Sequence, residues 1–489
     1  MSTLEQLRFD NTYTRLPSVF YQRVRPTPLP NPHLVSFNAA AAALIDLDPQ
    51  ESQRPEFLAF VNGDMLLPGS DPIATLYAGH QFGHYVPQLG DGRAILLGEI
   101  RNSRDEKWDV QLKGAGLTPF SRDGDGRAVL RSTIREYLCG EAMHGLGIPT
   151  TRSLCIISGN EMVWREQPEP GAILVRLAPT HIRFGTFEVF YYRRQFEELR
   201  ILADYVIDHH YPHLSGRDDR YTGLLHEVAV RTGQLIAQWQ AVGWAHGVMN
   251  TDNMSIVGIT LDYGPFGFME YFDPGFICNH SDRYGRYAFQ NQPDIGYWNI
   301  RAIAQALSPL VAPSDVQAAP DVYEHALLDR YAELMRAKLG LLESHVGDDK
   351  LVTDLLNLMH ANRVDYTTCF RMLAEFRQDD PDGLAGIRTL FKDSDGLTWW
   401  AERYRARLAA EKSIDEERRR RMNAVNPKYI LRNYLAQHAI EQALRHRDYT
   451  EIERLRVLLA DPYSDHPGME DYARPLPPEC PPIIVSCSS

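Results

Sequence analysis

The sequence predicts an α+β protein with two lobes, a small strand-rich lobe followed by a larger helical lobe. Short β-type runs such as RAILLGEI, WDVQLKG and GAILVRLA are concentrated between Tyr77 and about Val175, with one helical stretch, RSTIREYLCGEAMHGLG, among them. From about Arg193 onward helical patterns dominate. The clearest of them, LLHEVAVRTGQLIAQWQAVG, has an apolar face formed by Leu225, Val228, Leu235, Ile236 and Trp239.

The length of 489 residues is about three times that of a typical domain and leaves room for extensions at both ends of a two-lobed unit. In chain order we expect a loop-rich N-terminal extension (1–76), the strand-rich lobe (77–192), the core of the helical lobe (193–322), a further helical part (323–462) and a Pro-rich tail (463–489).

Composition and charge exclude several classes of protein. A hydrophobic share of 44% and a charged share of 24% are typical of a globular chain. The formal net charge of −13 repels nucleic acids and anionic membranes, so neither is an expected partner. The chain contains no run of about 18 apolar residues, and we expect a cytoplasmic protein.

Three motifs, two in the strand-rich lobe and one in the core of the helical lobe, match the needs of a nucleoside triphosphate. The first, LGDGRAILLGE, places Gly90 and Gly92 in a turn before a strand, where main-chain N–H groups can face an anion, and Arg93 adds a positive charge. The same Gly-Asp-Gly pattern also occurs in ordinary hairpin turns.

The second motif is a lysine on a strand followed by a glutamate on a helix. Lys113 ends the strand WDVQLK, and Glu136 follows 23 residues later in the expected helix. A lysine in the interior needs a counter-charge, and this order matches the ion pair that aligns ATP phosphates in protein kinases.

The third motif, HGVMNTDNMSIVGITLDYG, resembles the catalytic loop and metal motif of a kinase, with His246, Asn253 and Asp262 at the matching positions. A short hairpin between Asn253 and Asp262 would bring their oxygens to one divalent cation. Where a kinase has its catalytic aspartate, this loop has Val248, which cannot exchange a proton. Asp252 is the remaining carboxylate of the loop and is the candidate base.

Two arginines between the expected lobes, Arg176 and Arg183, suit phosphate binding because a guanidinium donates two parallel hydrogen bonds. The loop SRDGDGRAV, with Asp125 and Gly126, accompanies them. The alternative is that these arginines form structural salt bridges.

Longer motifs carry a family resemblance over nearly the entire chain. YAGHQFG (77–83), QLGDGRA, QLKGAG, HGVMNTDN, LDYGPFGFM and NPKYILRNYL (426–435) resemble the selenoprotein O family, also called the YdiU family. The tail VSCSS also fits, because bacterial members carry cysteine where animal members carry selenocysteine. The resemblance implies a bilobal, protein-kinase-like pseudokinase that binds ATP inverted and transfers AMP to Ser, Thr or Tyr hydroxyls of proteins, releasing pyrophosphate. Transfer of UMP from UTP has also been assigned to the family.

The resemblance also implies roles for individual residues. Asp252 would be the proton acceptor, and Asn253 and Asp262 would hold Mg²⁺ or Mn²⁺. Cys278 and Cys487 would form a redox pair. The expected partners are ATP, protein substrates that include redox-related ones, and the chain itself through self-modification. The nucleotide would be contacted by Gly90, Gly92, Arg93, Lys113, Asp125, Gly126, Arg176, Arg183 and Asp262.

Three other functions remain open from the residues. A true kinase would transfer the γ-phosphate with Asp252 as its base, and a scaffold pseudokinase would bind nucleotide without reaction. A metallohydrolase is suggested by His80 and His84 and by the histidines near His210, but neither group has the glutamate of a zinc-protease helix.

Overall fold

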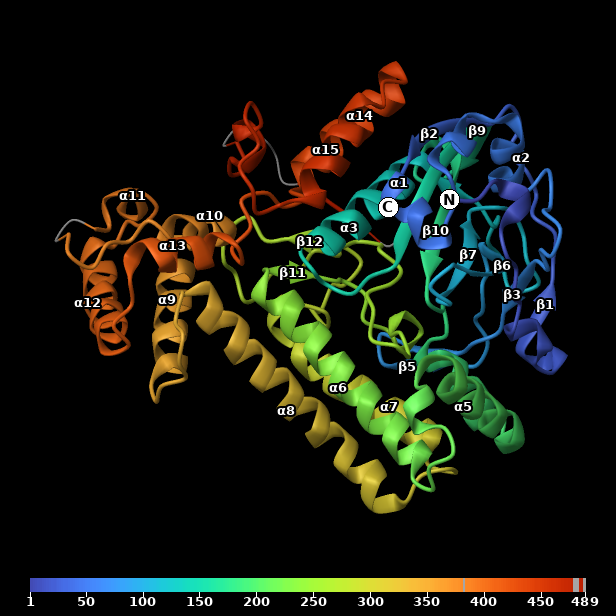
Figure 1. Cartoon of the computed structure of the whole chain (residues 1–489), viewed down its shortest axis with the longest axis horizontal. Coiled ribbons are helices and arrows are strands. Elements are labelled where there is room, and N and C mark those ends of the chain that lie inside the picture. Colours follow the sequence, from blue (N-terminus) through green and yellow to red (C-terminus); the bar gives the residue numbers. More distant parts are fainter. Residues whose placement is uncertain (381–382, 478–482, 487–489) are drawn as a thin grey trace.

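The computed structural model describes residues 1–380, 383–477 and 483–486 (Figure 1). It combines one large antiparallel sheet with a predominantly helical remainder, which confirms the expected mixture of strands and helices. Among the described residues, no helix is both long enough and apolar enough to cross a bilayer.

The large sheet is assembled from distant parts of the chain. Its strand order is β1-β3-β6-β7-β10-β9-β2, with β8 paired to β10 and every pair antiparallel. The first 76 residues supply β1, β2 and β3. The strands are β1 (Tyr21–Arg23), β2 (His33–Phe37), β3 (Ile73–Thr75), β6 (Ala94–Arg101), β7 (Lys107–Lys113), β8 (Ala128–Val129), β9 (Arg152–Trp164) and β10 (Pro168–Ala178).

Alternation along the strands gives the sheet two different faces. On β7, Val110 and Leu112 pack in the hydrophobic cluster that also holds the N-terminal helices α1 (Ala39–Ala42) and α2 (Pro55–Asn62). Gln111 and Lys113 therefore point to the opposite face, because successive side chains of a strand alternate. That face is covered by helix α3 (Leu130–Gly145), which contacts β9 and β10.

The helical part is built on a long buried helix. All five predicted core residues of α6 (Arg220–Ala241) are buried: Leu225, Val228, Leu235, Ile236 and Trp239. Helix α6 packs against α7 and α8 (Figure 1). The helices of this part are α4 (Phe184–Tyr192), α5 (Phe196–His210), α7 (Gln292–Leu307) and α8 (Pro313–Lys338), and short strands β11 (Trp244–Ala245) and β12 (Gly267–Phe268) pair beside them.

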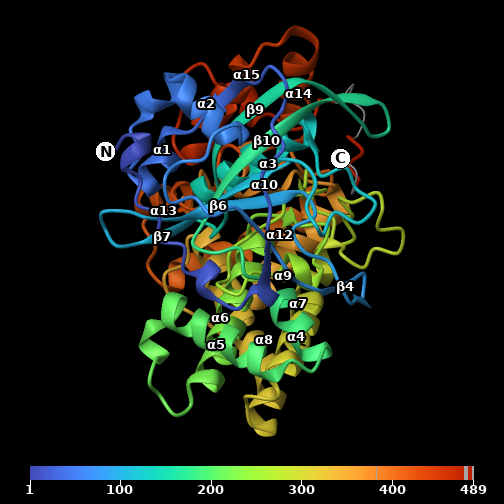
Figure 2. The same ribbon diagram turned by 90° about the vertical axis from the view of Figure 1, so that its right-hand side faces the viewer.

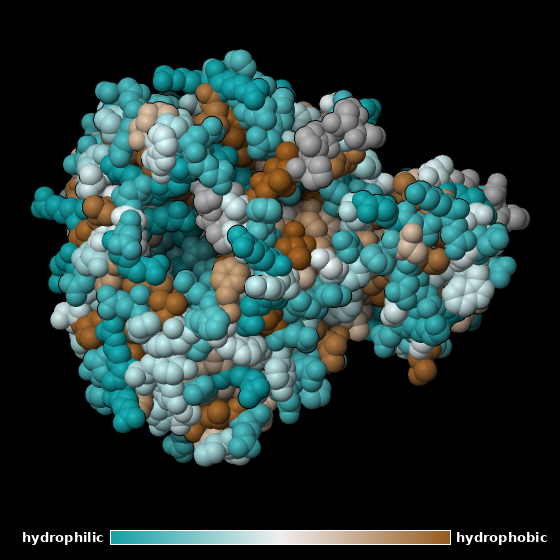
Figure 3. Space-filling model, turned by 180° about the vertical axis from the view of Figure 1, so that it is seen from behind, coloured by the Kyte–Doolittle hydropathy of each residue, from teal (hydrophilic) through white to brown (hydrophobic). Residues whose placement is uncertain are grey.

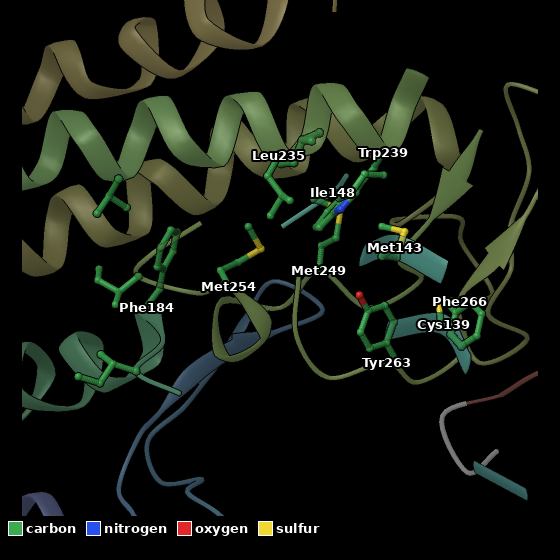
Figure 4. Packing of buried hydrophobic residues seen from close by; sticks show 14 of the residues in the cluster. Cys139, Met143, Ile148, Phe184, Leu235, Trp239, Met249, Met254, Tyr263 and Phe266 are labelled. Carbon is green, nitrogen blue, oxygen red and sulfur yellow. The ribbon is translucent and has the colours of Figure 1, made fainter. Parts of the chain in front are cut away.

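The loop that carries Asp252 is anchored at both ends. Met249 and Met254 are buried and pack in the same hydrophobic cluster as Leu235 and Trp239 of α6 (Figure 4). The four residues between the two methionines are thereby fixed beside this hydrophobic cluster.

The C-terminal third contributes two groups of helices. Helices α9 to α13 surround a separate hydrophobic cluster at one end of the molecule (Figures 1 and 3). In contrast, α14 and α15 return to pack on α3 (Figures 1 and 2). Their bounds are α9 (Asp348–Asn362), α10 (Tyr366–Leu373), α11 (Ala385–Arg388), α12 (Ser394–Ala410), α13 (Asp415–Asn423), α14 (Asn433–His446) and α15 (Thr450–Ala460).

Candidate nucleotide site

Glu136 on α3 is shared by two cations of the sheet. Its Oε2 lies 2.5 Å from the Lys113 Nζ, and its Oε1 accepts a hydrogen bond of 2.6 Å from the Arg176 Nε. Glu136 and Arg176 are each only 2% exposed. Burial lowers the pKa of Lys113 to about 8, although Glu136 acts to raise it. The predicted Lys–Glu pair is present, and Arg176 extends it into a triad.

Asp262 connects this triad, through Arg183, to the loop that carries Asp252. Its Oδ1 lies 2.8 Å from the Arg176 Nη2, and its Oδ2 accepts a hydrogen bond from Arg183. Burial would raise the pKa of Asp262, but Arg183, Arg176 and Lys113 outweigh burial and hold that pKa well below its ordinary value. The carboxylate therefore stays ionised, as a metal ligand must be. The backbone of Asp262 is left-handed, with φ 58°, a region that few residues other than glycine adopt but that aspartate and asparagine enter more readily than most.

His246 has a structural role in the loop. Its Nδ1 accepts from the Val248 N–H at 3.3 Å, so its Nε2 carries the proton and donates to the Leu261 carbonyl at 3.1 Å. Asn253 donates its Nδ2–H to the Val248 carbonyl at 2.9 Å. The amide is thereby oriented with its Oδ1 available, and that oxygen accepts no hydrogen bond from the described part of the chain.

These oxygens fit a hard divalent cation in kind. Carboxylate and amide oxygens are ligands that Mg²⁺ and Mn²⁺ accept, and Asn253 and Asp262 supply one each. Within the described ranges no group of three or more His, Cys, Asp or Glu side chains is arranged to hold a metal. Any cation at this pair would take its remaining ligands from phosphate and water.

Asp252 is nearly buried, at 7% exposure, under the hairpin of β4 (Gly79–Gln81) and β5 (His84–Val86). The Gln81 Nε2 donates to its Oδ2 at 3.2 Å, whereas its Oδ1 is buried without a hydrogen-bond partner in the described structure. Burial raises the pKa of Asp252 to about 6. A carboxylate with an unsatisfied oxygen and a raised pKa is suited to accept a proton.

The hairpin contact was not expected from the sequence. In the sequence, the motif YAGHQFG supports the family resemblance and its His80 suggests a metal ligand, whereas in the structure its residues contact three successive loop residues, Asn250 to Asp252. The His80 N–H donates to the Thr251 Oγ1 at 2.7 Å, and both side chains are tied to Glu188 of α4. Glycines in the motif were the available signal, because the backbone at Gly79 lies against Asp252: an added Cβ would be 2.7 Å from its Oδ1.

The glycine turn before β6 lies against the loop of residues 118–121. A Cβ at Gly90 would lie 2.6 Å from the Phe120 Cγ, and one at Gly92 would lie 2.9 Å from the Phe120 carbonyl. Close packing therefore requires both glycines. The side chain of Arg93 is exposed and forms no hydrogen bond or ion pair with the described residues, which leaves its charge available for an anion.

Asp125 lies apart from the other predicted residues in its contacts. Its carboxylate pairs with Arg165 at 2.6 Å and accepts from the Arg127 N–H at 2.9 Å. Gly126 has φ 71°, and a Cβ there would lie 2.1 Å from the Gly116 carbonyl. Asp125 and Gly126 thus lie in the loop that precedes β8 and make no direct contact with Arg176 or Arg183.

Of the two cysteines in the predicted redox pair, Cys278 lies among the described residues. Cys278 is buried, and its Sγ lies 2.8 Å from the Pro265 carbonyl, three residues after Asp262. Cys487 lies outside the described residues. The nearest described part of the tail docks close by, because the His280 N–H donates to the Val485 carbonyl at 2.8 Å. The pairing itself stays a prediction.

The site combines buried cations, two carboxylates that pair with them, and a candidate base. This combination is typical of an enzyme that transfers a phosphorus-containing group. The family model described as "Protein adenylyltransferase SelO" matches residues 3–459. The chain belongs to this family and is therefore an enzyme of the nucleotidyltransferase class.

Full-length relatives agree with this assignment. A protein of Myxococcus xanthus (strain DK1622) is 57% identical over 489 residues, covering 100% of both chains, and one of Thiobacillus denitrificans is 55% identical over 491 residues with the same coverage. A relative from Pseudomonas aeruginosa (strain LESB58) is 48% identical over 490 residues, again covering 100% of both chains. Each is named protein nucleotidyltransferase YdiU.

Proposed function

We propose that this chain is a protein adenylyltransferase that transfers AMP from ATP to Ser, Thr or Tyr hydroxyls of proteins. The observation that carries the proposal is the position of Asp252. Its Oδ1 has no hydrogen-bond partner among the described residues, and Arg183 links this residue to Asp262 by contacting both the Asp252 carbonyl and the Asp262 carboxylate. Val248 occupies the place of a kinase base, which disfavours ordinary γ-phosphoryl transfer. Family membership supports the same reaction class.

We interpret the fold as a kinase-like unit with two lobes. The sheet with α3 corresponds to the small lobe, and the helices around α6 correspond to the large lobe, with the divisions at residues 76, 192, 322 and 462 expected from the sequence. The Lys113–Glu136 pair, between a sheet strand and α3, supports this interpretation.

The residues divide the chemistry between donor and acceptor. Lys113, Arg176, Arg183 and Arg93 would neutralise the phosphates of ATP, so that the β- and γ-phosphates leave together as pyrophosphate. The Asp252 Oδ1 would take the proton of the acceptor hydroxyl as its oxygen forms a bond to the α-phosphorus. The bond from the α-phosphorus to the bridging oxygen breaks, and the electron pair leaves with pyrophosphate.

Asn253 and Asp262 would hold Mg²⁺ or Mn²⁺, which when bound supplies charge neutralisation for the phosphates. Gly90, Gly92, Asp125 and Gly126 would shape the loops next to the nucleotide. We extend the proposal to a cytoplasmic enzyme whose activity responds to pairing of Cys278 with Cys487, with redox-related proteins and the chain itself among the acceptors. UTP as a donor of UMP is the second donor to be tested.

The test is to supply ATP labelled on the α-phosphate in one reaction and on the γ-phosphate in another, with Mg²⁺ or Mn²⁺ and a generic protein acceptor. We expect protein-bound label from the α-position only, and none with Asp262→Ala. A parallel reaction with α-labelled UTP compares the two donors.

Glu227→Gln is the matched control, because Glu227 is a surface carboxylate that pairs with Arg231 in α6. Protein-bound label from the γ-phosphate alone would show that the chain is a protein kinase. Label from neither position, with nucleotide still bound, would show a scaffold.

A further inference from the structure

Arg286 is a half-buried cation beside the β4–β5 hairpin that has no carboxylate partner among the residues described. Its Nε is buried without a hydrogen-bond acceptor there. The guanidinium lies 5.2 Å from the ring centre of Trp298 and 5.7 Å from that of Tyr287. Aromatic rings stabilise the cation but do not neutralise it. By contrast, Arg176 and Arg183 are each paired with Asp262.

The tip of the hairpin is held in a strained shape next to this guanidinium. Phe82 has φ 50° and Gly83 has φ 85°, and the left-handed region is unfavourable for an aromatic residue. The Phe82 N–H donates to the Asn250 Oδ1 at 3.1 Å and to the Tyr287 hydroxyl at 3.2 Å. The same hydrogen bonds therefore connect the tip to the loop of Asp252 and to the segment of Arg286.

Glycine at position 83 leaves the guanidinium uncovered. A Cβ added there would begin 3.3 Å from the Arg286 Cζ, so a larger residue would crowd the charge. Phe82 is 36% exposed, and its ring centre lies 5.2 Å from that of Tyr287, the residue next to Arg286. The tip thus offers an apolar surface and an unpaired cation side by side.

The distance to Asp252 follows from the hairpin. Gln81 donates to the Asp252 carboxylate, and Gly83, against Arg286, is two residues further along the chain. Two residues of chain span at most about 7 Å, and Phe82 and Gly83 span less because both turn. An extended polypeptide with its hydroxyl at Asp252 would bring a side chain two or three residues away to Arg286.

We propose that Arg286 binds a carboxylate of the acceptor polypeptide, two or three residues from the hydroxyl that is modified. The inference rests on the proposed function and adds to it the class of acceptor, a segment with Glu or Asp near its Ser, Thr or Tyr. A guanidinium donates two hydrogen bonds to a carboxylate, and the flanking aromatic rings hold it flat for that contact.

The surroundings favour an acceptor group over the nucleotide. Arg286 contacts Gly83, Tyr287 and Trp298, which belong to the hairpin and the helical part, whereas Lys113 and Arg176 lie on the sheet. With a chain charge of −13, an acidic segment is repelled except where a cation is unpaired. Arg286 therefore selects both the charge of an acceptor residue and its position relative to the modified hydroxyl.

The experiment uses the full-length chain, α-labelled ATP and tyrosine peptides that carry Glu, Gln or Lys at two or three residues from the tyrosine. We expect kcat/KM to be about tenfold higher for the Glu peptides than for the Gln peptides. Arg286→Gln should remove that preference, and Arg286→Glu should reverse it toward the Lys peptides. Arg283→Gln, an exposed arginine of the same segment, is the matched control and should retain the preference.

Binding of a non-hydrolysable ATP analogue separates the explanations. It should change less than about twofold in Arg286→Gln, since the role assigned concerns the acceptor. Equal labelling of Glu and Gln peptides by the wild type would overturn the docking role and leave the transferase in place, as would a preference that survives Arg286→Gln. Absence of α-label on every peptide and protein would overturn the transferase and the docking role together.

Discussion

The two sides of the site differ in how their charges are satisfied. On the side formed by the sheet, Lys113, Arg176 and Arg183 are engaged by Glu136 or Asp262, and Arg93, which has no partner among the described residues, is exposed to solvent. On the hairpin side, the Asp252 Oδ1 has no hydrogen-bond partner and Arg286 has no carboxylate within the described ranges. Because an unpaired buried group costs free energy, the hairpin side is the one that a substrate must complete.

The largest effect should come from removing the unsatisfied carboxylate. We expect Asp252→Asn to lower kcat for AMP transfer by about 10²–10⁴-fold with little change in ATP affinity, since the amide cannot accept the proton and the sheet-side cations are untouched. Steady-state kinetics and analogue binding measure the two separately. A variant with normal kcat would show that Asp252 is not the base.

Breaking the satisfied side should cost stability as well as activity. Glu136→Gln removes the carboxylate shared by Lys113 and Arg176, and loss of one partner of a buried pair costs about 3–5 kcal/mol of unfolding free energy. Saturating ATP analogue should raise the melting temperature of this variant more than that of the wild type, because the phosphates replace the lost negative charge. Equal shifts in both proteins would argue against phosphate binding at this triad.

A buried cation away from the site tests the cost of an unpaired charge by itself. Lys338, at the end of α8, is buried and lies 4.2 Å from the ring centre of Phe370, and no ion pair to it occurs in the described structure. Burial lowers its pKa from 10.5 to about 7. Between these two pH values the unfolded chain binds the proton that the folded chain has lost. Stability from this group therefore rises with pH from about 7 to 10.5 and is lost as the pH falls through 7.

Lys338→Met should therefore stabilise the chain at pH 6 by on the order of 2–4 kcal/mol and remove this rise in stability above pH 7. Urea unfolding at several pH values measures both. Lys350→Met is the control, because Lys350 is exposed and pairs with Asp354, and it should change stability by less than about 1 kcal/mol. Identical pH dependence in wild type and Lys338→Met would contradict the assignment.

The sequence was informative where local periodicity or a motif places a residue. The strand before Lys113 and the helix of Glu136 have clear patterns, and their pair follows from alternation on the sheet and a helix packed on that face. Strands β1 and β3 have three residues each, too few for an alternating pattern, so the N-terminal segment was expected to be a loop-rich extension rather than an edge of the sheet.

The contact between Gln81 and Asp252 was out of reach for a different reason. The two residues are 171 positions apart, and a polar two-stranded hairpin has no apolar face from which its docking could be inferred. The unpaired state of Arg286 could not be predicted from the sequence either, because it becomes evident only when all neighbouring elements are in place.

The smallest effect should come from the hydrogen bond between Gln81 of the β4–β5 hairpin and the Asp252 carboxylate. Gln81→Leu keeps the size of the side chain but removes the donor to the Asp252 Oδ2, a bond of 3.2 Å that is longer than a strong one. Loss of one such bond to a charged group is worth about 1.5–3 kcal/mol at most, and we expect a three- to tenfold fall in kcat. Gln81→Asn, with a shorter side chain, should fall in the same direction, whereas Gln88→Leu, a glutamine beyond β5 that pairs with the surface Arg193, should not. If Gln81→Leu matched Asp252→Asn in its loss of kcat, the hairpin would do more than orient the carboxylate, and the acceptor would have to contact Gln81 directly.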